Sequence, residues 1–167
     1  MQIGVVKAEA KDKLVLENLL QLYDHDFSEF TASDVNAEGI YEEDPLDRWW
    51  SEPRRHPFLV KVDGQLAGLA LVRGQSAFTG DTGVTDMVEF FIMRKYRRRG
   101  VGGETATRLF DLFPGRWEVR QIAANAPAQA FWRKVIGVYT GGRFEERFVE
   151  DEQWRGPYQS FDTRERG

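Results

Sequence analysis

Residues 87–113 read MVEFFIMRKYRRRGVGGETATRLFDLF, and they decide how the rest of the chain is interpreted. Residues 88–92 form a short apolar run of β-branched and aromatic residues, which predicts a buried strand. A basic, glycine-rich turn follows at residues 97–103, and apolar residues then recur at helical spacing as far as residue 113. The stretch therefore predicts a strand, a glycine turn and a helix, in that order.

The glycine turn is suited to binding a phosphate group. The first backbone N–H groups of a helix have no partner within the helix, and the helix dipole favours negative charge beside them. Gly100, Gly102 and Gly103 have no side chain to hold a ligand away, and glycine tolerates positive φ. The chain has no Gly-x-x-x-x-Gly-Lys-Ser/Thr loop, and Thr105 stands where a dinucleotide fingerprint needs its third glycine. We expect a phosphate or pyrophosphate at this turn.

Composition narrows the function classes. The chain has 167 residues, of which 41 % are apolar, so it can bury a core. It contains no cysteine and two histidines, which excludes disulfides, thiolate metal sites and a cysteine nucleophile, and we expect no metal. The net charge is −4, yet residues 94–99 hold five basic side chains. This contrast favours a local anion site and argues against nucleic acid as a partner.

The chain shows no membrane or export signal. No apolar run approaches the roughly 20 residues of a membrane span. The N-terminal residues MQIGVVKAEAKDK carry charges where a signal peptide needs its apolar segment. We therefore expect a cytoplasmic protein with no membrane partner.

Periodicity and turn signals predict the remaining elements. Residues 3–6 read as a strand, and a helix begins at residue 12, since Leu16, Leu19, Leu20, Tyr23 and Phe27 share one face. Residues 31–57 are irregular except for a short helical turn at residues 46–50. Residues 58–72 form a hairpin, because Asp63-Gly64 between two apolar runs suits a type I′ turn. The later strands are expected at residues 117–123, 138–140, 144–148 and 158–161, with a helix capped by Asn125 after the first of them.

Two motifs carry a family resemblance. Arg97-x-x-Gly100-x-Gly102 after a strand resembles motif A of the GNAT superfamily of acetyl-CoA-dependent N-acetyltransferases. Asn125-x-x-Ala128-x-x-Phe131-Trp132-x-Lys134 resembles motif B of the same superfamily, and it follows motif A in the expected order. The resemblance implies an α+β fold in one domain over residues 1–167. That fold has a central mixed, mostly antiparallel, twisted sheet of six to seven strands, flanked by about four helices.

The resemblance also implies a cofactor site. The backbone amides from residue 98 to residue 103 would hold the pyrophosphate of acetyl-CoA, and nearby arginines would add charge-assisted contacts. The strand edge would pair with the pantetheine, placing the thioester where this strand splays from residues 117–123. The cofactor-binding residues expected on this basis are Phe91, Ile92, Met93, Arg97, Arg98, Arg99, Gly100, Val101, Gly102, Gly103 and Asn125.

Acetyl transfer to an amine needs a base, an oxyanion donor and a means to protonate the leaving thiolate. The N–H of Ile92 or Met93 would supply the donor. Asp86 and Glu89 are the candidate bases, and burial among apolar residues would raise the pKa of Glu89 toward neutrality. A salt bridge to a neighbouring strand is the alternative role for Glu89.

The chain departs from the motif B pattern at the expected acid. Trp132 stands where the superfamily often has a tyrosine, and an indole N–H is not a general acid near neutral pH. Tyr139 from a following strand, Tyr23 or Tyr158 could replace it, or no acid is needed because a thiolate leaves readily.

Two groups of residues are candidates for binding the acceptor. Aromatic and acidic residues at positions 23–30 form either a core stripe with solvated acids between or one wall of a pocket for a cationic group. Trp49 and Trp50, in the irregular stretch, either close the edge of the core or line an acceptor pocket. The substrate-binding candidates are Tyr23, Asp26, Phe27 and Trp49.

The leading hypothesis is transfer of an acetyl group from acetyl-CoA to a primary amine of a small molecule or peptide, by direct attack on the thioester. One alternative is a non-catalytic acyl-CoA-binding sensor of the same fold, which Trp132 favours. An anion-binding module that uses the arginine run is another. A homodimer is also consistent with the resemblance.

Overall fold

The computed structural model describes residues 1–166. Its seven strands are β1 (Ile3–Lys7), β2 (Arg55–Val62), β3 (Gln65–Arg73), β4 (Val84–Ile92), β5 (Arg116–Arg120), β6 (Glu145–Glu150) and β7 (Arg155–Asp162). Its helices are α1 (Lys13–Thr31), α2 (Arg48–Ser51), α3 (Val101–Leu112) and α4 (Ala126–Thr140), with 3-10 turns at Ala10–Asp12, Arg94–Tyr96 and Thr163–Glu165.

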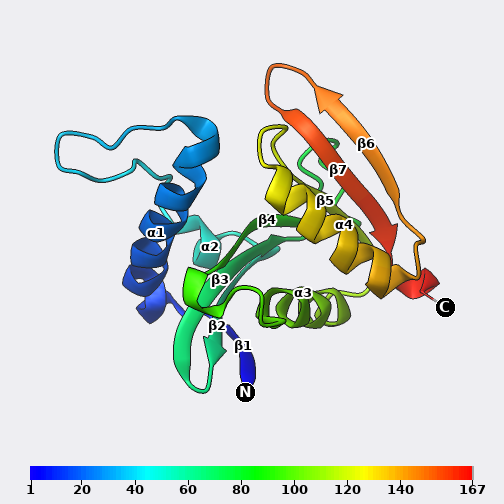
Figure 1. Cartoon of the computed structure of the whole chain (residues 1–167), viewed down its shortest axis with the longest axis horizontal. Helices are drawn as coiled ribbons and strands as arrows, with labels where there is room; N and C mark the ends of the chain where they lie inside the picture. Colours follow the sequence, from blue (N-terminus) through cyan, green and yellow to red (C-terminus); the bar gives the residue numbers. More distant parts are fainter. Residues whose placement is uncertain (167) are drawn as a thin grey trace.

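The strands form one sheet in the order β1-β2-β3-β4-β5-β7-β6 (Figure 1). Neighbouring strands are antiparallel except β4 and β5, which are parallel. The expectation of a mixed, mostly antiparallel sheet with about four helices is confirmed. No helix within residues 1–166 has the length and apolar character needed to cross a membrane.

Helices cover both faces of the sheet (Figure 1). On one face, α1 and α2 bury Leu16, Leu20 and Trp49 against β2, β3 and β4. On the other, α3 and α4 bury a larger aromatic cluster that includes Phe110, Trp117, Trp132 and Phe161. The two layers explain the apolar composition of β2 and β3, because strands covered on both faces read as continuous apolar runs.

The predicted hairpin is present between β2 and β3. Asp63 has φ 49° and Gly64 has φ 80°, and positive φ at both central residues is what a type I′ turn requires. The prediction from the Asp-Gly pair is therefore confirmed.

The expected strand at residues 138–140 is wrong. This segment is the last turn of α4, where Ile136 and Thr140 are buried, and the helix ends at Gly141 with φ 64°. The sequence offers Gly137 and the Gly141-Gly142 pair as helix terminators, and packing of Ile136 and Thr140 carries the helix past Gly137 to Gly141. Tyr139 consequently lies on a helix.

Candidate active site

β4 and β5 separate part-way along their length. The ladder pairs Val84, Thr85 and Asp86 of β4 with Arg116, Trp117 and Glu118 of β5, and it ends there. Beyond Asp86 the opening between the two strands holds a cavity of about 210 Å³, which we call the cleft. Its walls include Tyr23 from α1, Glu89 and Phe90 from β4, Arg120 from β5, and Asn125 and Trp132 around the start of α4.

The backbone of β4 presents alternate groups to this opening. Met93 donates its N–H to the carbonyl of Ala67 at 2.8 Å, and Ile92 lies opposite Gly68. Because hydrogen-bonded and non-hydrogen-bonded pairs alternate in an antiparallel ladder, the polar groups of Ile92 are directed away from β3. Of the three expected residues, Ile92 therefore has its N–H on the side where β4 has separated from β5, whereas the N–H groups of Phe91 and Met93 face β3.

A β-bulge sets the direction of the Glu89 side chain. Leu71 of β3 pairs with Glu89 and Val72 pairs with Met87, so Val88 is an extra residue in β4. In a regular strand Glu89 would share the face of Met87, which packs against α3 and α4. The bulge reverses the alternation, so Glu89 faces α1 and Phe90 contacts the Phe131 and Trp132 rings of α4.

Glu89 is partly buried in the cleft wall, and its surroundings hold its pKa near neutrality. Burial, reinforced by the negative charges of Asp24 and Asp86, raises the pKa of Glu89 to about 7. The Tyr23 hydroxyl and the charge of Arg120 act in the opposite direction. Glu89 can therefore exchange a proton near neutral pH, as a general base must.

Asp86, the other candidate base, is held in an ion pair. It is fully buried, and both of its carboxylate oxygens accept from the Arg120 guanidinium at 2.7 Å. Arg120 also lies 5.1 Å from the centre of the Trp154 ring. Since both oxygens are already occupied, Asp86 supports Arg120 and the sheet, and Glu89 is the carboxylate with access to the cleft.

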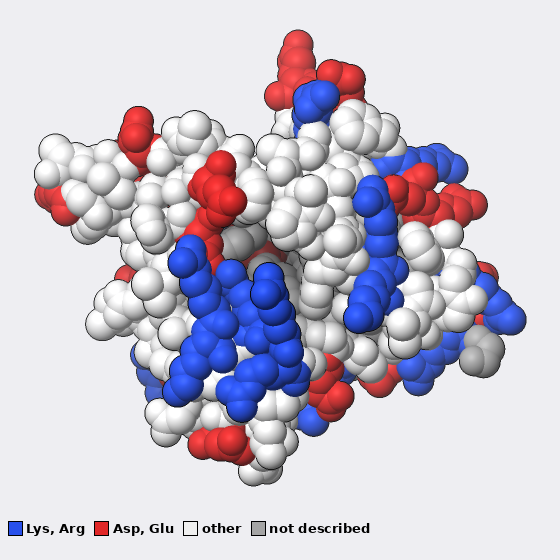
Figure 2. Space-filling view, in the orientation of Figure 1, with Lys and Arg blue, Asp and Glu red and all other residues white. Residues whose placement is uncertain are grey.

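The basic turn precedes α3 as expected. Arg98 has φ 59° and Gly100 has φ 83°, and an added Cβ at Gly100 meets no atom within 4 Å. The first helical hydrogen bond runs from the N–H of Glu104 to the carbonyl of Gly100 at 3.0 Å. The N–H groups of residues 101–103 therefore precede the hydrogen-bonded ladder and can receive an anion. Figure 2 shows basic side chains gathered over the segment between β4 and α3, beside a hollow in the surface.

The three glycines of this turn have different surroundings. A Cβ at Gly102 would lie 3.0 Å from the Phe131 ring, so this glycine lets α3 approach α4. A Cβ at Gly103 would make an ordinary contact of 3.8 Å with Val135. The Val101 side chain is fully buried, so only its backbone is available to a ligand. Gly100 is the position whose missing side chain leaves open space.

Arg97 differs from the two arginines that follow it. Its Nε donates to the carbonyl of Ile92 at 2.6 Å, and its guanidinium pairs with Asp26, which also binds Arg94. Although partial burial acts in the opposite direction, these two arginines lower the pKa of Asp26. Asp26, expected to bind substrate, is thus engaged in anchoring the turn to α1. Arg98 and Arg99 are exposed at the surface.

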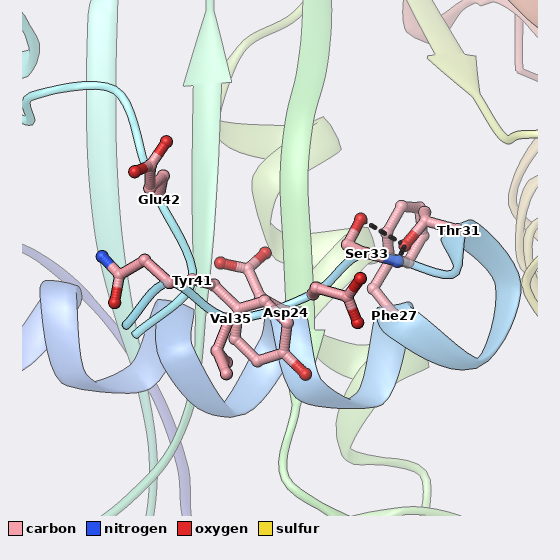
Figure 3. Close-up of a pocket in the computed structure, with 9 residues that line it drawn as sticks. Asp24, Phe27, Thr31, Ser33, Val35, Tyr41 and Glu42 are labelled. Atoms are coloured by element: carbon pink, nitrogen blue, oxygen red, sulfur yellow. Dashed lines mark hydrogen bonds between the residues drawn. The ribbon is translucent and has the colours of Figure 1, made fainter. Parts of the chain in front are cut away.

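A second, larger cavity lies between α1 and the loop at residues 32–47. It has a volume of about 450 Å³, and we call it the acid pocket because Asp24, Asp34 and Glu42 line it and no lysine or arginine does. Phe27 lines both the acid pocket and the cleft, so the two cavities adjoin. In Figure 3, Asp24 and Phe27 extend from α1, and the loop that faces the helix contributes Ser33, Val35, Tyr41 and Glu42.

The comparisons with known proteins identify the family. The model of the acetyltransferase (GNAT) family matches residues 16–138. The chain belongs to the GNAT family. This confirms the resemblance drawn from the two motifs, and the chain is an acetyltransferase by family. No curated protein sequence matches the chain.

Solved structures share the fold. An acetyltransferase from Thermus thermophilus has a TM-score of 0.68 at 16 % identity, with 97 % of each chain covered. Aminoglycoside acetyltransferase AAC(6')-Ib in complex with coenzyme A has a TM-score of 0.68 at 14 % identity, covering 98 % of this chain and 96 % of its own. Spermidine N-acetyltransferase from Vibrio cholerae, in complex with CoA and spermine, has a TM-score of 0.64 at 14 % identity, covering 98 % and 97 %. These comparisons give no support to a non-catalytic sensor.

The motif B residues of this GNAT chain lie at the cleft. Asn125 caps α4 by accepting from the N–H of Ala128 at 3.1 Å, and it also lines the cleft. Its side-chain oxygen serves the helix, which leaves its amide N–H groups for a ligand. Trp132 lines the cleft as well and packs edge-on against Phe90.

Besides Asp86 and Asp26, two more of the expected catalytic and substrate-binding residues lie outside both cavities of this GNAT fold. The Tyr139 hydroxyl donates to Asp111 at 2.7 Å, and burial and that carboxylate raise the pKa of Tyr139 to about 12. Trp49 is 7 % exposed, and Arg55 lies over its ring at 5.0 Å. Both side chains therefore have partners of their own, away from the cleft and the acid pocket.

The structure also reveals site residues that sequence reasoning missed. Arg120 and Trp154 line the cleft, and Tyr41 lines the acid pocket beside Asp24, which belongs to the acidic stretch at residues 23–30. Burial and the Asp24 carboxyl raise the pKa of Glu43, next to this pocket, to about 9. The signal available in the sequence was the excess of acids in the irregular stretch at residues 31–57.

Proposed function

We propose that this GNAT protein transfers an acetyl group from acetyl-CoA to a primary amine of a small molecule or peptide. The observation that carries the proposal is the second half of β4, where Glu89 lines the cleft and the N–H of Ile92 is directed away from β3, just before the glycine turn. A base, a donor for a developing negative charge and an anion-binding helix start are thus arranged along one strand end and the turn that follows it.

The glycine turn is the part of the chain that fits the phosphates. Open space at Gly100, the N–H groups of residues 101–103 and the exposed Arg98 and Arg99 suit a pyrophosphate. When bound, acetyl-CoA supplies the activated acetyl group. The N–H of Ile92 stabilises the thioester oxygen as it gains charge, and Asn125 contacts the cofactor arm.

Glu89 prepares the acceptor. An ammonium group cannot attack, so a base must first remove its proton, and a carboxylate with a pKa of about 7 does this near neutral pH. Glu89 acts directly or through one water molecule held in the cleft.

The acid pocket favours an acceptor with more than one positive charge. Its carboxylates and the Tyr41 and Phe27 rings suit an ammonium group, through charge and through cation–π contact. Because this pocket adjoins the cleft, one ammonium can rest there while a second amine reaches Glu89. Two solved structures of the same fold, one with spermine and one with the aminoglycoside kanamycin, are consistent with acceptors of this kind.

Calorimetric titration with acetyl-CoA tests the proposal first. We expect micromolar binding that weakens when an analogue lacking the pyrophosphate replaces acetyl-CoA. The absence of binding would overturn the cofactor assignment and move the anion-binding module forward.

An amine panel then tests the acceptor, with release of the CoA thiol as the readout. Diamines, polyamines and aminoglycosides should react faster than neutral monoamines of similar length. The preference should fall in Asp24→Asn and persist in Glu29→Gln, since Glu29 is an exposed acid on the same helix outside the pocket. Equal rates for mono- and dications would remove the role of the acid pocket.

A further inference from the structure

The cleft contains very few groups that can release a proton to a leaving thiolate. Among the side chains that line it within residues 1–166, the tyrosine, Tyr23, and the glutamate, Glu89, are the two with a transferable proton. Arginine, tryptophan and amide side chains keep their protons at any ordinary pH. Tyr139, the tyrosine suggested by the sequence, is bound to Asp111 outside the cleft.

Tyr23 is held in place by packing. Its ring lies 5.4 Å from the Phe91 ring and 5.5 Å from the Phe27 ring. This packing fixes the ring between α1 and β4, and Tyr23 and Glu89 line the same cleft. The two groups are close enough that each moves the pKa of the other, Tyr23 lowering that of Glu89 and Glu89 raising that of Tyr23.

We propose that Tyr23 is the general acid of the transfer and that Tyr23 and Glu89 form a proton relay which resets itself in every turnover. This inference rests on the proposed function. The amine nitrogen forms its bond to the acetyl carbon, the carbon–sulfur bond breaks, and the sulfur takes the proton of the Tyr23 hydroxyl. The proton lost by the amine passes to Glu89, and Glu89 returns it to the Tyr23 oxygen. The net change is one proton moved from the amine to the thiol, with both residues restored.

The surroundings keep the Tyr23 hydroxyl protonated before the transfer. Asp24 and Glu43 lie on the side of α1 and its loop, Asp86 on β4 and Arg120 on β5. Burial and the Glu89 charge raise the pKa of Tyr23 well above its ordinary value, so its hydroxyl is protonated at the start of each cycle. A phenol that must give up its proton needs a nearby donor to recover it, and Glu89 in its protonated form is that donor.

The first test measures the acidity of the CoA thiol when it is bound in the cleft. The native protein and Tyr23→Phe are saturated with CoA, and the thiolate is titrated by its ultraviolet absorbance. We expect the bound thiol to be about tenfold more acidic in the native protein, because the Tyr23 hydroxyl donates to the thiolate. Tyr139→Phe, which removes another carboxylate-bound tyrosine, should leave the thiol unchanged.

The outcomes separate the two proposals. CoA binding with the same thiol acidity in Tyr23→Phe would overturn the relay and leave the proposed function standing. No CoA binding by the native protein would overturn both. A purely structural role of Tyr23 would change cofactor affinity or stability without changing the thiol.

Turnover gives a second measurement. Tyr23→Phe should lower kcat about 100-fold with little change in the KM for acetyl-CoA. If this variant does not fold, fluorotyrosine incorporation keeps every hydroxyl and makes the phenols more acidic. We expect the rate to fall at high pH, where the Tyr23 hydroxyl loses its proton. In the fluorotyrosine protein this fall should occur at lower pH, and a fall at the same pH would overturn the proposal.

Discussion

The two halves of β4 place similar carboxylates in opposite situations. Asp86 lies where β4 still pairs with β5, is fully buried, and binds Arg120 through both oxygens. Glu89, three residues further on, lies after the bulge and beyond the end of the β4–β5 ladder, where Tyr23 faces it. A carboxylate with a cation at close range serves the structure, whereas one left with a neutral hydroxyl can exchange protons.

The largest effect should come from breaking the ion pair between Arg120 and Asp86. Arg120→Met leaves Asp86 buried without its cation, and we expect the free energy of unfolding to fall by about 3 kcal/mol. Chemical denaturation measures this. Arg116→Met, which breaks the exposed pair with Asp81, is the matched control and should cost less than about 1 kcal/mol. Similar losses in both variants would mean that burial does not distinguish the two pairs.

A change at Glu89, in the second half of β4, should alter activity. Glu89→Gln removes the base, and we expect kcat to fall about 100-fold while acetyl-CoA affinity stays unchanged. In the native protein the rate should rise with pH up to about 7, as Glu89 loses its proton, and this limb should be absent from the variant. Rates of Glu89→Gln equal to native at all pH values would remove Glu89 as the base.

The contribution of Glu89 to stability should depend on pH in the opposite sense to its contribution to the rate. Because the fold raises the pKa of Glu89 from 4.5 to about 7, the native state retains a proton that the unfolded state has lost between these pH values. Native stability therefore falls as pH rises through this window, and Glu89→Gln removes that contribution. Denaturation at pH 5 and pH 8 should show the variant gaining relative to the native protein at the higher pH.

A smaller effect is expected at the glycine turn that follows β4. Gly100→Asn keeps a residue type that tolerates positive φ while placing a side chain in the space left for the phosphates, so acetyl-CoA affinity should fall at least about tenfold. Gly141→Asn, at the end of α4 with φ 64° and equally open surroundings, is the control. Calorimetry should find native affinity in the control. Unchanged affinity in Gly100→Asn would contradict the phosphate assignment.

The smallest effect is expected from Asp24, whose charge raises the pKa of Glu89. Asp24 raises the pKa of Glu89, so Asp24→Asn should move the low-pH limb of the rate to lower pH, by less than about one unit. The pKa of Glu43 should fall for the same reason. The pH profile of kcat measures the first effect, with Glu29→Gln as the unshifted control. A shift to higher pH would mean that Asp24 acts on Glu89 in some other way.

Much of the frame was predictable because it depends on local chemistry. The helix at residues 12–27, the Asp63-Gly64 hairpin and the strand–turn–helix unit around Gly100 each follow from spacing, capping and φ preferences within a few residues. The prediction of a strand at residues 138–140 failed because both Gly137 and the Gly141-Gly142 pair could end the helix, and burial of Ile136 and Thr140 favours the later end.

The site was predictable where it depends on β4 and the turn, and it was not where it depends on contacts across the fold. Glu89 was found because it is an acid within an apolar run. Its pairing with Tyr23, the use of Asp86 by Arg120 and the use of Asp26 by Arg94 and Arg97 join residues far apart in the sequence. Nothing in local spacing indicates which acid receives which cation.

The sequence by itself determined the order of the elements as far as the helix capped by Asn125, the anion-binding turn and the presence of an acid on the central strand. Those features follow from side-chain size, backbone freedom and periodicity, which act over a few residues. The tertiary structure alone decided which way that acid points. One extra residue, Val88, reverses the alternation of β4, and beyond the end of the β4–β5 ladder Glu89 makes no ion pair within residues 1–166, since Arg120 pairs with Asp86. Register and burial arise only when distant strands pair, because they depend on the partner strand.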